Sequence, residues 1–199
     1  MNIESADKTT LLELARAAIR KGLATPIPPT LPDVPVKGPL AEPGATFVTL
    51  TRTGNLRGCR GTLVPIQPLA ADVAANAFFS AFEDPRFRPL TAEELDDLAL
   101  EIAVLSPLEP LPPLTEAELL DRLRPGVDGL LIEDAGRRAT FLPKVWNTLP
   151  EPADFVRELK RKAGLPAAYW TRAMRCQRYT TENFGAAFAS SESESTYPR

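Results

Sequence analysis

The chain has 199 residues, a hydrophobic fraction of 44%, a charged fraction of 25% and a formal net charge of -3. These values are typical of a globular protein with a sizeable core, and they exclude a global electrostatic field that would draw the molecule to DNA or to an anionic membrane. The start of the chain is polar, and no stretch approaches the roughly 20 apolar residues that span a bilayer. We therefore expect a cytoplasmic protein without membrane association.

The chain contains no histidine. Ser-His-Asp and Cys-His catalysis in their usual forms are thereby excluded, as are the zinc and iron sites that need histidine. Cys59 and Cys176 are too few for a disulfide framework; they could pair, but in a reducing compartment we expect two free thiols. We expect neither a metal nor a cofactor, and proton transfer near pH 7 would need a carboxylate, Lys, Tyr or Cys with a shifted pKa.

The N-terminal part predicts one helix followed by extended chain. Apolar residues recur at helical spacing from a capping box that begins at Thr10, with Ser5 and Asp7 as earlier cap candidates, and Gly22 ends the run. Residues 25–45 carry seven prolines. Such a segment favours polyproline-like chain, either a strap across the surface or a linker.

A β-hairpin is predicted next. Residues 47–52 alternate as a strand does, residues 53–55 supply a turn, and residues 56–64 return as the second arm. On strand alternation Arg57 and Cys59 share one face of this arm. Its two glycines weaken the strand, so we expect a bulge or a close approach of another backbone there.

Short helices and one strand follow the hairpin. A helical stripe extends from Pro68 to Phe82 and stops before Pro85. Capping boxes that begin at Thr91 and Thr115 open two short helices. Between these helices, residues 98–106 predict a strand.

The remaining chain predicts a hairpin, a helix and a strand. Residues 129–142 form the hairpin, residues 152–162 an amphipathic helix that ends near Gly164, and residues 172–184 the last strand. Residues 189–199 are polar and low in complexity, so we expect a disordered tail. Because hairpins force antiparallel pairing, the whole pattern predicts an α+β fold with helices flanking an antiparallel sheet.

Two stretches could carry chemistry. In LRGCRGT, residues 56–62, an arginine on each side of Cys59 would favour the thiolate, and backbone N–H groups of a glycine-rich turn can bind an anion. The structural alternative is a buried cysteine in a hairpin. In the loop of residues 83–91, Arg86 could hold a carboxylate or phosphate, or Asp84 could cap or pair locally.

Several long motifs, in the same order, resemble the AMMECR-one domain family, the "A" component of the AmmeMemoRadiSam set. The resemblance covers about residues 10–185 and rests on FVTLTRTGNLRGCRGTL, PLAADVAANAFFSAFEDPRFRPLT, LALEIAVLSPLEPL, LRPGVDGLLIEDAGRRATFLPKVW and LKRKAGLP. It implies one α+β domain over residues 1–188 in two unequal lobes, the larger built from both chain ends. It also implies association with a Memo-type protein and a radical SAM protein.

The resemblance also implies a site. With it we expect Cys59 to act as nucleophile or acceptor, Arg57 to lower the pKa of the thiol, and Arg86 to clamp a small anion. A carboxylate such as Asp84 would have to move protons. The ligand-binding residues would include Gly58, Gly61 and Thr62. Two positions depart from the family pattern: Arg60 replaces an aliphatic residue and must reach solvent or a carboxylate, and Arg88 stands where proline is more frequent.

Three functions are compatible with these patterns. The first is an enzyme, or an enzyme subunit, of a modification pathway with the two partners named above. The second is a non-catalytic adaptor, which the proline-rich segment, the basic face of the helix at residues 152–162 and the incomplete catalytic set favour. The third is a nucleic-acid binding module, against which the acidic net charge argues.

Overall fold

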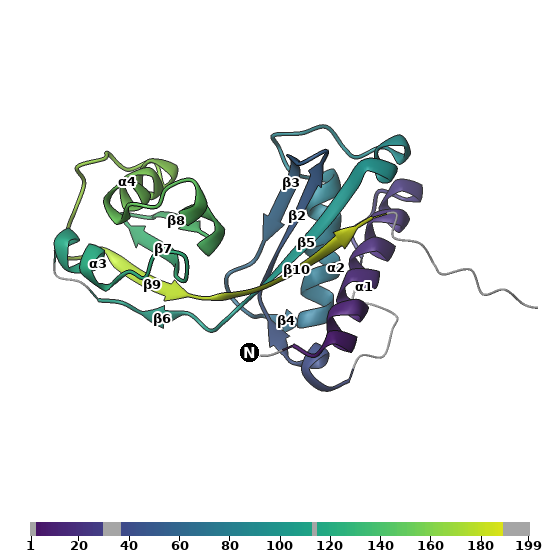
Figure 1. Ribbon diagram of the computed structural model, residues 1–199, viewed down its shortest axis with the longest axis horizontal. Helices are drawn as coiled ribbons and strands as arrows, with labels where there is room; N and C mark the ends of the chain where they lie inside the picture. The colour runs from purple at the N-terminus through teal and green to yellow at the C-terminus, as the bar shows by residue number, and fades with distance from the viewer. Residues whose placement is uncertain (1–2, 30–36, 113–114, 189–199) are drawn as a thin grey trace, which may run out of the picture. The chain divides into compact units, whose positions relative to one another are not determined.

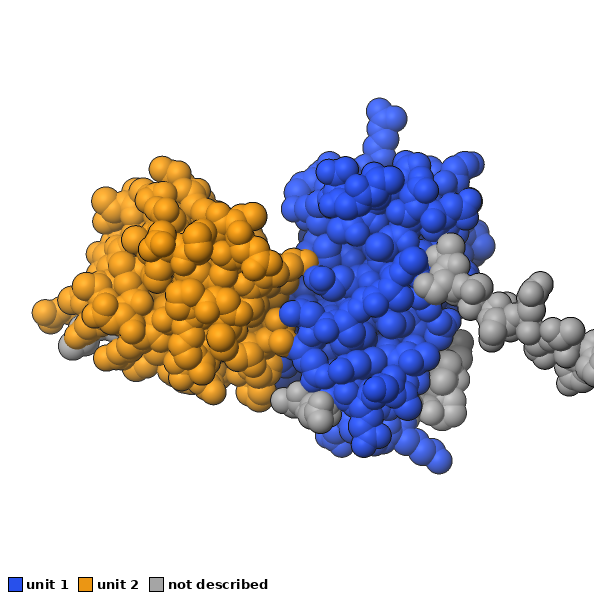
Figure 2. All heavy atoms as spheres, in the orientation of Figure 1, with its two compact units in different colours: residues 1–105, 182–199 blue, residues 106–181 orange. Residues whose placement is uncertain are grey.

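The computed structural model describes residues 3–29, 37–112 and 115–188, and the chain divides into two compact units (Figure 1). Unit 1 comprises residues 1–105 and 182–199, and unit 2 comprises residues 106–181 (Figure 2). The α+β class and the two unequal lobes, the larger with both chain ends, are confirmed. The disorder predicted for residues 189–199 falls outside the described residues, and a single domain ending at residue 188 stays a prediction.

Unit 1 contains a four-stranded sheet in the order β10 (Thr181–Ala187), β5 (Leu98–Leu105), β2 (Thr46–Arg52) and β3 (Asn55–Gly61). Helix α2 (Leu69–Phe82) packs against β2 and β3, and α1 (Ser5–Ala24) packs against α2 (Figure 1). β2 is antiparallel to both of its neighbours. Because alternate residues of a strand face the same side, β2 buries Val48 and Leu50 under the helices.

Short elements complete unit 1. The described end of the proline-rich segment forms a 3-10 turn, η1 (Gly38–Ala41), and a two-residue strand, β1 (Pro43–Gly44), which pairs with β4 (Gln67–Pro68). A second 3-10 turn, η2 (Ala92–Asp97), carries the predicted capping box at Thr91. The predicted extended segment of residues 25–45 therefore contains local structure at its C-terminal end, and residues 30–36 lie outside the described chain.

Unit 2 has its own sheet and core. The strand order is β6 (Glu109–Pro110), β9 (Arg175–Tyr179), β7 (Gly129–Asp134) and β8 (Arg137–Phe141). Its helical elements are α3 (Glu116–Arg122), η3 (Pro143–Asn147) and α4 (Pro152–Lys162). At the centre of the core the rings of Trp146 and Phe155 stack with centroids 3.8 Å apart. Within the described residues, no helix is both long and apolar enough to cross a membrane.

Two predicted elements need correction. Residues 172–184 were expected to form one strand, but they form β9 in unit 2 and β10 in unit 1, with Thr180 between them. Thr180 forms hydrogen bonds with Ser106, the first residue of unit 2. The chain therefore leaves unit 2 beside the point where it entered it. The antiparallel sheet content of the predicted α+β fold is divided, within the described residues, between two four-stranded sheets and one two-stranded sheet.

The first helix also begins earlier than its predicted cap. It starts at Ser5, and Thr10 lies inside it, where its hydroxyl donates to the carbonyl of Ala6. Thr and Ser often make this bond to the preceding turn, so a capping-box pattern alone does not locate a helix start.

The predicted irregularity of the hairpin is present. The β2–β3 register shifts between Leu50 and Thr51, and Leu50 lies opposite Gly58. Gly58 faces α2 so closely that a Cβ atom there would lie 2.0 Å from the carbonyl oxygen of Ser80. At Gly61 a Cβ atom would lie 2.3 Å from the ring of Phe47. Both glycines are therefore required by close packing, as the sequence pattern suggested.

We predict that Gly58→Ala destabilises the protein by about 3 kcal/mol, because either α2 or β3 must move to admit the methyl group. Urea unfolding measures the loss. Leu56→Ala on the same strand is the control, since Leu56 is largely exposed and its truncation should cost under about 1 kcal/mol. Equal stability of the two variants would contradict the close approach of helix and strand.

Candidate functional site

Buried polar side chains occur at every fourth residue along α2, and the same spacing continues to Asp84, two residues after the helix ends. We call these four residues the polar stripe. The relative exposures of Asp72, Asn76, Ser80 and Asp84 are 0%, 3%, 0% and 4%. Residues four apart lie on one face of a helix, so the stripe faces a single partner, the β2–β3 hairpin. Each member bonds to that hairpin, and the last of them reaches Cys59.

The first two members anchor the start of the hairpin. Asp72 accepts hydrogen bonds from the backbone N–H of Thr46 at 2.8 Å, from the Thr46 hydroxyl at 2.7 Å and from the Thr62 hydroxyl at 2.8 Å. Asn76 donates to Asp72 and to the carbonyl of Thr46. A buried carboxylate without a cation needs several donors, and this network supplies them.

Ser80 joins the two strands directly. Its hydroxyl accepts from the backbone N–H of Arg60 at 2.8 Å and donates to the carbonyl of Val48 at 2.8 Å. Val48 and Arg60 are opposite one another in the ladder, so the hydroxyl bridges them. Within the described residues the Arg60 side chain has no hydrogen-bonding partner and is exposed to solvent, as its replacement of an aliphatic residue required.

Asp84 holds the backbone of Cys59. Its Oδ2 accepts the Cys59 N–H at 2.9 Å, on the outer edge of the sheet, since β3 is an edge strand. Arg86 donates to the same carboxylate from Nε at 2.9 Å and from Nη2 at 2.6 Å. The Arg86 guanidinium, followed by the backbone donors of Cys59 and Arg86, holds the pKa of Asp84 well below its usual range. Asp84 therefore stays ionised near neutral pH, which suits a positioning role better than proton transfer.

Cys59 is half-buried, and its sulfur lies 3.5 Å from the hydroxyl of Thr49. The two residues are directly opposite in the β2–β3 ladder, and Thr49 in turn lies opposite Glu101 on β5. The Oδ2 atom of Asp84 accepts both from the Cys59 N–H and from Nη2 of Arg86. The structure thus brings Cys59, Asp84 and Arg86 together.

Arg57 has a different partner. At the bulge it donates to Glu94 from Nε at 2.6 Å and from Nη2 at 2.9 Å, and Nη2 also reaches the carbonyl of Arg88. Its Nη1 is buried without a partner among the described residues. The Glu94 carboxylate raises the pKa of Arg57, and Arg57 lowers the pKa of Glu94 to about 2. Within the part of the chain described, Arg57 makes no hydrogen bond to Cys59.

One aromatic ring lies near both guanidinium groups. The Cζ atoms of Arg57 and Arg86 lie 5.8 Å and 5.5 Å from the centroid of the Phe87 ring. Both distances are within the range of cation–π attraction. The loop of residues 83–91 therefore contacts both arginines, although each cation has its own carboxylate.

The predicted ligand-binding residues have structural contacts. Thr62 donates to Asp72, and the two glycines of the motif pack against Ser80 and Phe47. A role of these residues toward a ligand stays a prediction. Among the described residues, no cluster of three or more His, Cys, Asp or Glu side chains could hold a metal ion.

Sequence reasoning missed Asp72, Ser80 and Glu94. The first two had a signal, because polar residues spaced by four inside an apolar helix indicate a buried polar face. Glu94 had none, since it lies 37 positions from Arg57 and belongs to a capping box that explains it locally.

We predict that Glu94→Gln destabilises the protein by about 3 kcal/mol at pH 7, since Arg57 would remain mostly buried without its counter-ion. The folded-state pKa of Glu94 is depressed to about 2 from 4.5. Its contribution is therefore complete above about pH 4.5 and is lost as the pH falls toward 2. The difference in unfolding free energy between wild type and variant, measured with urea from pH 7 to pH 2.5, should shrink in that window.

Asp96→Asn is the control for this titration, because Asp96 is an exposed carboxylate of the same 3-10 turn. It should change stability by under about 0.5 kcal/mol at every pH. A gap for Glu94→Gln that stays constant down to pH 2.5 would show that the ion pair does not stabilise the fold.

The comparisons with known proteins agree on one family. The AMMECR1 family model matches residues 12–184. An uncharacterised protein of Methanothermobacter thermautotrophicus is 37% identical over 183 residues, covering 88% of this chain and 92% of its own. The crystal structure of Uncharacterized Protein PH0010 from Pyrococcus horikoshii matches with a TM-score of 0.81 and 34% identity, over 88% of this chain and 89% of that one. The chain belongs to the AMMECR1 family.

Proposed function

We propose that this protein is a cytoplasmic component of a modification pathway, that it works with a Memo-type and a radical SAM protein, and that Cys59 is its reactive group. The partners follow from the family resemblance. The observation that supports the thiol is its placement. An ionised carboxylate that also binds the Arg86 guanidinium holds the Cys59 N–H, and the sulfur lies 3.5 Å from the Thr49 hydroxyl.

These neighbours suit a thiol that attacks or accepts a group. The thiolate is the nucleophilic form of a cysteine, and a cation beside a thiol is the usual means of favouring it. Arg86 uses Nε and Nη2 for Asp84, while Nη1 makes no bond within the described residues and the side chain is 55% exposed. Arg86 can therefore also hold the small anionic ligand that we propose.

Selective alkylation of the folded protein tests this proposal. We predict that iodoacetamide at pH 7 modifies Cys59 and leaves Cys176 unmodified, as read by peptide mass spectrometry. Cys176 is an internal control, because it is only 4% exposed and burial raises the pKa of its thiol to about 12. If Cys59 reacts only after denaturation, or no faster than Cys176, the reactive-thiol proposal is wrong.

A variant pair separates the effect of Arg86 from that of general positive charge. Arg86→Gln should slow alkylation of Cys59 several-fold, since it removes the cation held on the carboxylate that also binds the Cys59 N–H. Arg88→Gln is the matched control in the same loop: its side chain is exposed, and the carbonyl that accepts from Arg57 is retained. Equal rates for both variants would assign the reactivity to something other than Arg86.

A non-catalytic adaptor is the second candidate. It is favoured by the pairing of Arg57 with Glu94 and of Arg86 with Asp84, which leaves no complete catalytic set among the described residues. Cys59→Ser would distinguish the two: an adaptor keeps its capture of the Memo-type partner and its cellular phenotype, whereas a reactive-thiol component keeps the first and loses the second. Nucleic-acid binding has less support, because Arg157 and Arg161 on α4 pair with acidic residues of the same helix.

A further inference from the structure

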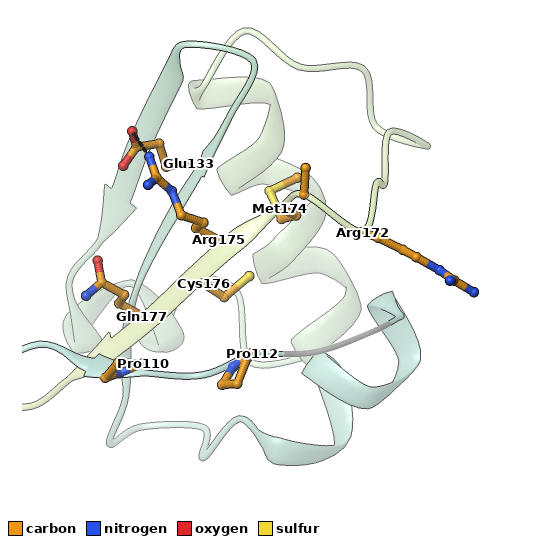
Figure 3. A pocket seen from close by; sticks show the side chains of 9 residues that line it. Pro110, Pro112, Glu133, Arg172, Met174, Arg175, Cys176 and Gln177 are labelled. Atoms are coloured by element: carbon orange, nitrogen blue, oxygen red, sulfur yellow. Dashed lines mark hydrogen bonds and ion pairs between the residues drawn. The ribbon is translucent and has the colours of Figure 1, made fainter.

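Unit 2 contains a cavity that none of the predicted site residues lines. Its volume is about 520 Å³, within the usual range of small-molecule sites. It is lined by Pro110, Pro112, Glu133, Arg172, Ala173, Met174, Arg175, Cys176 and Gln177 (Figure 3). All of these residues belong to unit 2, so the cavity is independent of the Cys59 site.

The cavity has a structural cause in the backbone. β6 pairs with β9 at Gln177 and Arg178, and the next bond is from the Leu111 N–H to the Cys176 carbonyl at 2.8 Å. Among the described residues this is the last backbone bond between the two segments. The two segments diverge beyond Cys176, and the space between them is the cavity (Figure 3).

The floor of the cavity is apolar and uncharged. Met174 and Cys176 are each 4% exposed, and they belong to the core of the unit. Because burial raises the pKa of the Cys176 thiol to about 12, the sulfur is neutral at physiological pH. Two prolines add apolar surface opposite β9. A ligand that fills this space needs a compact apolar group.

The rim carries an excess of positive charge. Arg175 donates to Glu133 at 2.6 Å, which leaves these two charges balanced. Arg172 makes no hydrogen bond or ion pair within the described residues, and its side chain extends freely from the loop before β9 (Figure 3). The net charge of the lining is therefore one positive unit, contributed by Arg172.

The loop that carries Arg172 is anchored on both sides. The Thr171 hydroxyl donates to Asp134, and Tyr169 donates to the same carboxylate at 3.2 Å. The backbone N–H groups of Ala173 and Met174 donate to the hydroxyl and carbonyl oxygens of Thr171, each at 3.2 Å. The backbone of the rim is thus set before any ligand arrives, so that only the Arg172 side chain must rotate on binding.

From these features we infer that the cavity of unit 2 binds a small organic monoanion, with its apolar part over Met174 and Pro112 and its carboxylate on Arg172. A planar guanidinium can hold a carboxylate through two hydrogen bonds. Arg172 is the one lining cation whose donors are all available among the described residues, and the floor beside it accepts an uncharged group.

The two methionines of the chain provide a direct test. In protein labelled with 13C-methyl methionine, the Met174 signal, assigned with Met174→Leu, reports on the cavity floor. Titration with benzoate should shift this signal saturably, and benzamide and benzylamine should bind at least about tenfold more weakly. No saturable shift with benzoate up to about 10 mM, or equal binding of benzamide, would overturn the proposal.

Variants of the rim should change benzoate binding in opposite directions. Arg172→Gln should weaken it at least about tenfold, and Arg161→Gln on α4, which does not line the cavity, should leave it unchanged. Glu133→Gln should tighten binding, because it removes the one negative charge of the lining. Tighter binding cannot arise from misfolding. Unchanged binding in both rim variants would contradict the role of charge at this site.

Discussion

The polar stripe of α2 is the interaction on which unit 1 depends. Buried backbone groups must find partners, and the β2–β3 hairpin finds several of them on the side chains of Asp72, Ser80 and Asp84. Each of these bonds is specific to one position of the ladder. A slip of the hairpin by one residue would leave polar groups unpaired under the helix. The stripe therefore fixes the position of the hairpin relative to α2. Gly58 makes these hydrogen bonds possible, because α2 can approach β3 this closely only where there is no side chain.

The same stripe places the candidate site. Cys59 follows Gly58, and its N–H meets the last carboxylate of the stripe, which also binds Arg86. The backbone of Cys59 therefore has little freedom, whereas the residue is only half-buried and its sulfur lies beside Thr49. The two arginines of the neighbourhood are divided between two carboxylates, with Phe87 near both. Arg86 remains partly exposed, whereas Arg57 is mostly buried and its ion pair with Glu94 holds the bulge of β3 against η2.

Much of the fold could be predicted because periodicity is a local property. The hairpins, α2 and α4 follow from alternation and from helical spacing, and the α+β class follows from their order. The sheet to which a strand belongs depends on distant residues. The alternation of residues 172–184 therefore did not predict their division between β9 and β10. For the site, the proximity of Cys59 to the DPRF loop followed only from grouping motifs. The pairing of Arg57 with Glu94 depends on a bulge and joins residues 37 positions apart, and neither feature can be derived from composition or spacing.

The two four-stranded sheets differ in how the backbone groups at the end of their strand pairing are satisfied. An edge strand presents unpaired backbone groups that can recruit another chain. On β3 the Asp84 carboxylate occupies the edge at Cys59, which closes this position to strand addition, and Cys59 itself is only half-buried. In unit 2 the described bonds between β6 and β9 end at Leu111, and the cavity lies beside the next residues of β9. At one edge a carboxylate thus fixes the backbone of Cys59, whereas in unit 2 a cavity lies where the described strand pairing stops.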